Sequence, residues 1–123
     1  MGMVFIYQKD YSLIDIETEL SISIPGINIY RPQFLRTAKL RLQKNTPEVV
    51  LVDESAQDAL ELVRYIKSSP ALSLIHIVYF LTHEEDLDGI RSDIGSNGLF
   101  NQVFVKGSYH PSEVVGSIED FLQ

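Results

Sequence analysis

The stretch that decides the fold is Pro47-Glu-Val-Val-Leu-Val-Asp-Glu54, in which four consecutive aliphatic residues end abruptly in two acids. A short apolar run without polar alternation is typical of a parallel strand that is covered on both faces. Asp53 follows directly, at the carboxyl end of that strand, where open α/β sheets place their polar crevice. The stretch therefore predicts a buried central strand with a carboxylate at the functional edge of the sheet.

Four more apolar runs of strand length lie on either side of this stretch, at residues 3–7, 27–30, 74–81 and 102–105. Apolar residues at helical spacing follow each strand. The helix after the fourth strand is expected to be short or mobile, because Gly89 and Gly95 each cost about 1 kcal/mol relative to alanine. Five strands that alternate with five helices predict a doubly wound parallel sheet with helices on both faces.

Several side chains are expected at helix starts or on inner helix faces. Ser12 and Asp15 form a weak capping box at the first helix. The inner face of the second helix is expected to include Phe34, and that of the last helix Phe121. The residues expected to begin the third and the last helix are Ser55 with Asp58, and Pro111.

Composition limits the class of protein. A chain of 123 residues suits one domain and can bury about two-thirds of its unfolded surface. We expect that domain to span residues 1–123, with its fold complete at Leu122. The net charge of −7 disfavours direct binding to nucleic acid. No cysteine is present, which excludes disulfides and thiolate metal sites. The apolar start is too short for a signal peptide or a membrane helix, so a cytoplasmic protein without membrane contact is expected.

Polar residues that follow the strands are expected to meet at one edge of the sheet. They are Gln8 and Lys9 after the first strand, Asp53 after the third, Thr82 after the fourth and Lys106 after the fifth. Each has an ordinary explanation alone: a helix cap, a turn residue or a surface base. Together, a carboxylate nucleophile with a hydroxyl and an ammonium group could accept and hold a phosphoryl group.

Three segments carry a resemblance to a known family. Pro47-Glu-Val-Val-Leu-Val-Asp53, Ile77-Val-Tyr-Phe-Leu-Thr82 and Val103-Phe-Val-Lys106 resemble the third, fourth and fifth strands of bacterial response-regulator receiver domains, the CheY-like superfamily. The resemblance implies a flavodoxin-like strand order of 2-1-3-4-5. It also implies that Asp53 is the phosphoacceptor, Thr82 the switch hydroxyl, Lys106 the conserved lysine of the family and Phe104 the switch aromatic.

The sequence departs from this family after the first strand. Receivers carry two acids there that hold a magnesium ion, and Gln8 and Lys9 take those places, with Asp10 as a possible remnant that is expected to cap the first helix. Magnesium needs several oxygen ligands, so no cofactor is expected. We expect Lys9 to pair with Asp53 instead, since opposite charges about 4 Å apart attract by roughly 4 kcal/mol at an intermediate dielectric. Gly107 also replaces a proline that is usual after the lysine.

These features predict a pseudo-receiver: a non-enzymatic signalling domain of a two-component or phosphorelay system. Its partner is expected to be another signalling protein or a second copy, bound through the fourth helix, fifth strand and fifth helix. The alternative is a working phosphoacceptor phosphorylated on Asp53, which needs Asp10 or Glu54 to recruit magnesium. A third option is a small flavodoxin-like enzyme, although the loop after the first strand has no glycine for a phosphate cradle. His76, His83 and His110 lack the spacing of a metal site.

Overall fold

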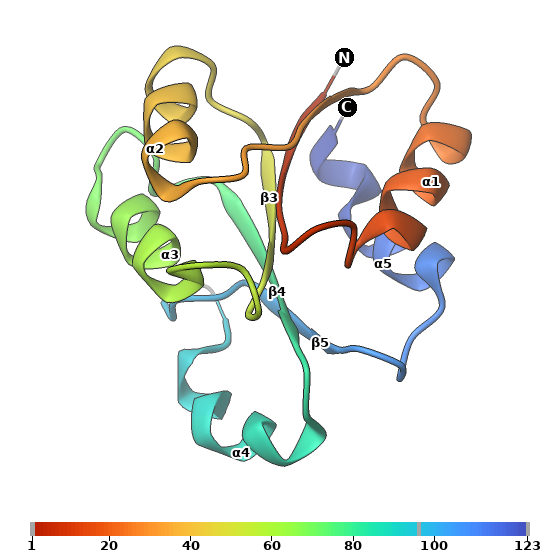
Figure 1. Ribbon diagram of the computed structural model, residues 1–123, viewed down its shortest axis with the longest axis vertical. Helices are drawn as coiled ribbons and strands as arrows, with labels where there is room; N and C mark the ends of the chain where they lie inside the picture. The colour runs from red at the N-terminus through yellow and green to blue at the C-terminus, as the bar shows by residue number, and fades with distance from the viewer. Residues whose placement is uncertain (1, 96, 123) are drawn as a thin grey trace.

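The computed structural model describes residues 2–95 and 97–122, which form a five-stranded parallel sheet with helices on both faces (Figure 1). The order of the strands is β2-β1-β3-β4-β5, as the sequence predicts. β3 lies at the centre of the sheet between β1 and β4, which explains why every residue of this strand is buried. The strands are β1 (Met3–Tyr7), β2 (Asn28–Tyr30), β3 (Val49–Asp53), β4 (His76–Leu81) and β5 (Gln102–Val105).

Five α-helices alternate with the strands. In Figure 1, α2 and α3 lie on one side of the sheet and α1 and α5 on the other. Three 3-10 turns complete the structure: η1 (Glu84–Asp86) and η2 (Arg91–Asp93) on either side of α4, and η3 (Glu119–Leu122) after α5. The helices are α1 (Ile14–Ser23), α2 (Leu35–Lys44), α3 (Ala59–Ser68), α4 (Leu87–Ile90) and α5 (Pro111–Ile118).

Alternate residues of each central strand point into two separate cores. In β3, Val50 and Val52 pack in the cluster that includes residues of α2 and α3, while Val49 and Leu51 pack in the cluster that includes residues of α1 and α5. Both faces of the strand are therefore apolar, because side chains along a strand alternate between the faces of the sheet. This burial is the physical reason for the uninterrupted aliphatic run before Asp53.

The fourth helical segment is short, as its glycines predict. α4 has four residues, including Gly89, and 3-10 turns stand on both of its sides. None of its residues is fully buried, although Leu87 and Ile90 contact the core. The sequence Ser96-Asn-Gly98 is typical of a turn, and Ser96 lies outside the described residues. Among the described residues, no helix is long and apolar enough to cross a membrane.

Some local predictions were wrong. Ser12 and Asp15 form no capping box, because α1 begins at Ile14, beyond Ser12. Ser55 and Asp58 make no capping hydrogen bond to α3; Asp58 precedes that helix in the left-handed region, at φ 58°. The fourth strand begins at His76.

Two aromatic residues predicted to face inward lie at the surface. Phe34 precedes α2 rather than lying within it, and 62% of its surface is exposed. Phe121 is 47% exposed and lies in η3, where its ring stacks on that of His76 with centroids 4.0 Å apart. The helical spacing of these residues did not predict their burial, because Phe34 lies before α2 and Phe121 lies after α5.

Candidate functional site

Asp53 is the last residue of β3, and it is fully buried. β4 pairs with it in parallel register, through Phe80, so the carboxylate lies at the carboxyl edge of the central strands. A buried carboxylate loses its hydration, and an isolated one would be very unfavourable. Its neighbours must therefore supply positive charge or hydrogen bonds.

Both carboxylate oxygens of Asp53 have hydrogen-bond donors. Oδ1 lies 2.6 Å from the ammonium nitrogen of Lys106. The same oxygen accepts hydrogen bonds from the backbone N–H of Ser55 at 2.9 Å and from its hydroxyl at 2.8 Å. The hydroxyl of Ser12 donates to Oδ2 at 2.5 Å. The protein itself therefore supplies at least one donor to each oxygen of the carboxylate.

These contacts decide the charge of Asp53. Burial acts to raise its pKa, but the ion pair with Lys106 and the hydrogen bonds from Ser12 and Ser55 outweigh burial, so the pKa lies below its usual value. The group is therefore ionised at neutral pH and its charge is compensated within the protein.

The ammonium group that compensates Asp53 belongs to Lys106 and not to Lys9. The backbone N–H of Lys106 donates to the carbonyl of Leu81 at 2.9 Å, which continues the β4–β5 ladder by one residue and carries the lysine to the edge of the sheet. Gly107 follows at φ 83°, a left-handed conformation that glycine adopts without steric cost. Lys9 is exposed and forms no ion pair within the described residues, so the expected Lys9–Asp53 pair was wrong.

The loop between β1 and α1 explains this difference. Gln8 is 9% exposed, and its side-chain oxygen accepts a hydrogen bond from the backbone N–H of Leu13 at 2.7 Å, just before α1. Asp10 adopts a left-handed conformation at φ 54° and lies at the surface, so it does not cap α1 as expected. The loop thus turns Gln8 toward the helix start and brings Ser12 to the carboxylate of Asp53.

Thr82 and Phe104 lie close to the site without contacting Asp53. The side chain of Thr82 is exposed, and its backbone N–H donates to the carboxylate of Glu54. Phe104 is half-buried; its ring stacks near Phe80 with centroids 5.9 Å apart, and it meets Tyr109 edge-on. The hydroxyl expected to hold a phosphoryl group is thus near the pocket but outside its hydrogen-bond network.

Within the described residues, the structure shows no cluster of metal ligands around Asp53. Magnesium prefers near-octahedral oxygen coordination and is usually bound through one or two carboxylates together with water. Within residues 2–95 and 97–122, no group of three or more acidic, histidine or cysteine side chains could hold a metal ion. The neighbouring acid, Glu54, is bound to the Thr82 amide. The structure thus brings together Asp53 and Lys106 of the predicted residues and adds two hydroxyls, those of Ser12 and Ser55, in place of metal ligands.

Ser12 and Ser55 were not predicted to donate hydrogen bonds to Asp53. Their sequence context favours helix caps, and both lie in turns close to a helix start. Only the left-handed turn at Asp10, which is not visible in the sequence pattern, directs Ser12 toward β3.

Comparison with known proteins supports the architecture. No protein-family model and no curated protein matches the sequence significantly. Among solved structures, the signal receiver domain of a DNA-binding response regulator from Colwellia psychrerythraea 34H superposes with a TM-score of 0.77 at 19% identity, over 98% of this chain and 97% of that one. The chemotaxis response regulator CheY4 of Vibrio cholerae gives a TM-score of 0.76 at 14% identity, over 99% of both chains. The phosphorylated cyanobacterial phytochrome response regulator RcpA gives 0.74 at 21% identity, over 98% of this chain and 93% of that one. The chain therefore has the fold of the response-regulator receiver domain.

Proposed function

We propose that this domain is a pseudo-receiver: a cytoplasmic, non-enzymatic module of two-component signalling that binds other proteins without magnesium-dependent phosphorylation. The observation that carries the proposal is that both carboxylate oxygens of Asp53 are engaged by donors of the protein itself. Lys106 compensates its charge, and Ser12 and Ser55 donate hydrogen bonds to both of its oxygens. A carboxylate that attacks a phosphoryl group needs an accessible oxygen and, in a magnesium-dependent reaction, further metal ligands beside it; here both oxygens already accept hydrogen bonds, and the described residues show no cluster of metal ligands.

The chain retains a surface suited to protein binding. β5 is an edge strand of the sheet, and all four of its residues are only partly buried. The neighbouring α4 has no fully buried residue, and segments with few buried contacts have low local stability. The face made by α4, β5 and α5 is therefore the proposed contact surface for a partner protein or a second copy.

This surface is also strongly charged. Glu84, Glu85, Asp86 and Asp88 are exposed within five residues of η1 and α4. Acidic side chains at this density favour a partner with a basic patch and repel nucleic acid, because complementary charge steers association.

The test is incubation with a small phosphodonor and magnesium, followed by intact mass measurement. We expect no added phosphoryl group on the native protein, since the oxygens of Asp53 are engaged and no cluster of metal ligands is found among the described residues. A working receiver treated in parallel should gain one group per chain, which controls for the reagent. Stoichiometric phosphate that disappears in Asp53→Asn would overturn the proposal and favour a working phosphoacceptor.

A further inference from the structure

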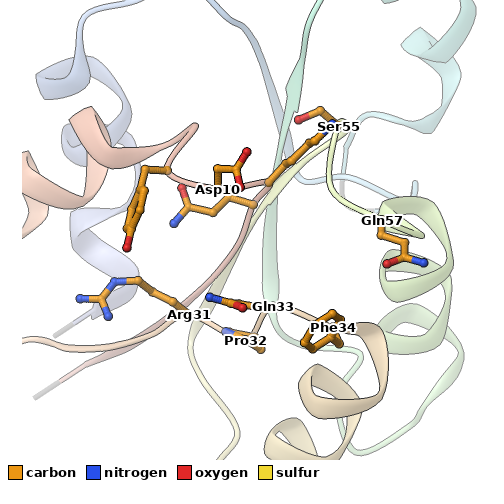
Figure 2. A pocket seen from close by; sticks show the side chains of 10 residues that line it. Asp10, Arg31, Pro32, Gln33, Phe34, Ser55 and Gln57 are labelled. Carbon is orange, nitrogen blue, oxygen red and sulfur yellow. The ribbon is translucent and has the colours of Figure 1, made fainter.

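A cleft lies beside the Asp53 site, over β1 and toward β2, with a volume of about 550 Å³. It is lined by residues 8–11 of the β1–α1 loop, residues 31–34 of the β2–α2 loop, and Ser55 and Gln57 after β3; we call it the β1–β2 cleft. Figure 2 shows Arg31, Gln33 and Phe34 along one wall, across from Asp10 and Ser55. Neither Asp53 nor Lys106 lines it. Its volume falls in the range of small-molecule sites.

Gln8 provides a donor of fixed orientation in this cleft. The residue is nine-tenths buried, and its side-chain oxygen is committed to the Leu13 N–H at 2.7 Å. The amide nitrogen is therefore the end that faces the cleft, and no hydrogen-bond partner for it is found among the described residues. No fully buried side-chain nitrogen or oxygen of the described residues lacks a partner, so this amide nitrogen is reached by solvent, and an acceptor of a ligand would take the place of water there.

Two cationic side chains line the cleft together with the Gln8 amide. Arg31 is held by one nitrogen only, since its Nε donates to Glu17 at 2.6 Å, and this contact orients a guanidinium group that has further N–H donors. Lys9 also lines the cleft, and it has no ion-pair partner in the described part of the chain. Asp10 is the one carboxylate among the lining residues. Cationic side chains therefore outnumber acidic ones among the lining residues, and the charge of Arg31 is shared with Glu17, which lies outside the lining.

Two aromatic rings complete the lining. Tyr11 is 70% exposed and Phe34 is 62% exposed, although large aromatic side chains usually bury most of their surface. An aromatic ring of a ligand that packs against either side chain would remove apolar area from water, which favours binding.

We propose that the β1–β2 cleft binds a small anionic molecule that has an aromatic ring. The anionic group would lie at the Gln8 amide, Lys9 and Arg31, and the ring against Tyr11 or Phe34. Gln8 and Lys9 are the residues that replace the acidic pair of receiver domains. Their substitution therefore exchanges a cation site for an adjacent anion site. This inference concerns ligand binding alone and does not depend on the partner surface of α4, β5 and α5.

Four probes separate the features of the ligand: adenosine 5′-monophosphate, benzoate, adenosine and inorganic phosphate. Binding is followed by the NMR signals of the Gln8 side-chain amide and the Arg31 Nε–H in labelled protein. We expect a saturable shift with at least one aromatic anion, and at least tenfold weaker binding of adenosine and of phosphate. Preference for the phosphate or the carboxylate probe identifies the anionic group. Phosphate that binds as tightly as the aromatic anions, or no saturable shift with any probe at millimolar concentration, overturns the proposal.

Substitutions locate the site. Lys9→Gln combined with Arg31→Gln should weaken the binding of the aromatic anion at least tenfold, because the two cationic side chains beside the ligand's anionic group are lost. Arg91→Gln is the matched control, since Arg91 is likewise exposed and donates through Nε to an acid, Asp88, at 2.6 Å. Equal affinity in the double variant and the control would contradict the assignment. Thermal unfolding of both proteins confirms that any loss of binding is not a loss of fold.

Discussion

Replacing Asp53 by alanine is expected to lower the free energy of unfolding by about 2–4 kcal/mol at neutral pH. The substitution leaves the Lys106 ammonium, which is 24% exposed on its side chain, and the Ser12 and Ser55 donors without their acceptor. Urea unfolding of the two proteins measures the difference. In a metal-binding pocket without its metal, several carboxylates repel one another, and removing one relieves that repulsion. The sign of the change therefore distinguishes this site from a metal-binding one.

Two further variants make this measurement specific. Glu84→Ala removes an exposed acid near the same edge of the sheet and should change stability by less than about 0.5 kcal/mol. Lys106→Met should also destabilise the protein, because it removes the charge that compensates a fully buried carboxylate, although Ser12 and Ser55 still donate to that carboxylate. If Asp53→Ala is as stable as the native protein or more stable, the carboxylate is not compensated as the structure indicates.

Ser12→Asp is expected to destabilise the protein by about 2–4 kcal/mol relative to Ser12→Asn, because it places a second carboxylate beside Asp53. The native hydroxyl lies 2.5 Å from Asp53 Oδ2, so the new charge has little room to move away. Two facing carboxylates also form the beginning of a cation site, so millimolar magnesium should recover part of the lost stability. Urea unfolding with and without magnesium measures both effects.

Ser12→Asn is the matched control for Ser12→Asp, since asparagine has nearly the same size as aspartate and no charge. It should be insensitive to magnesium. Equal stability of the two variants, in the presence or absence of the ion, would show that Ser12 does not face Asp53 in solution.

The sequence was sufficient to predict the fold because burial on both faces of the sheet requires apolar residues at every position of a central strand. β1 and β5 were predicted with their observed bounds, and β3 to within one residue. Asp53 and Lys106 could be placed at one edge because parallel strands all end on the same side. Element order and hydrophobic pattern thus determine which residues can meet.

The hydrogen-bond partners of Asp53 could not be predicted in the same way. Which side chain reaches the carboxylate depends on the conformation of the loop after β1, and there a left-handed residue, Asp10, changes the direction of the chain. Lys9 and Ser12 are three residues apart, yet only Ser12 contacts Asp53. Phe34 was assigned to the core because its spacing fits α2, but the helix begins one residue later. The residue types of such a loop do not indicate which of its residues will adopt a left-handed conformation.

The most direct test of the compensated carboxylate is the titration of the Asp53 side-chain carbon by NMR, with and without magnesium. Because Lys106, Ser12 and Ser55 outweigh the effect of burial, the pKa of Asp53 should lie below the usual aspartate value of about 3.9. Asp53 then stabilises the fold fully above that value, and this stabilisation is lost as the pH falls through the pKa of the folded state. The pKa should not change with millimolar magnesium. A pKa above the usual value that falls as magnesium is added would contradict the account.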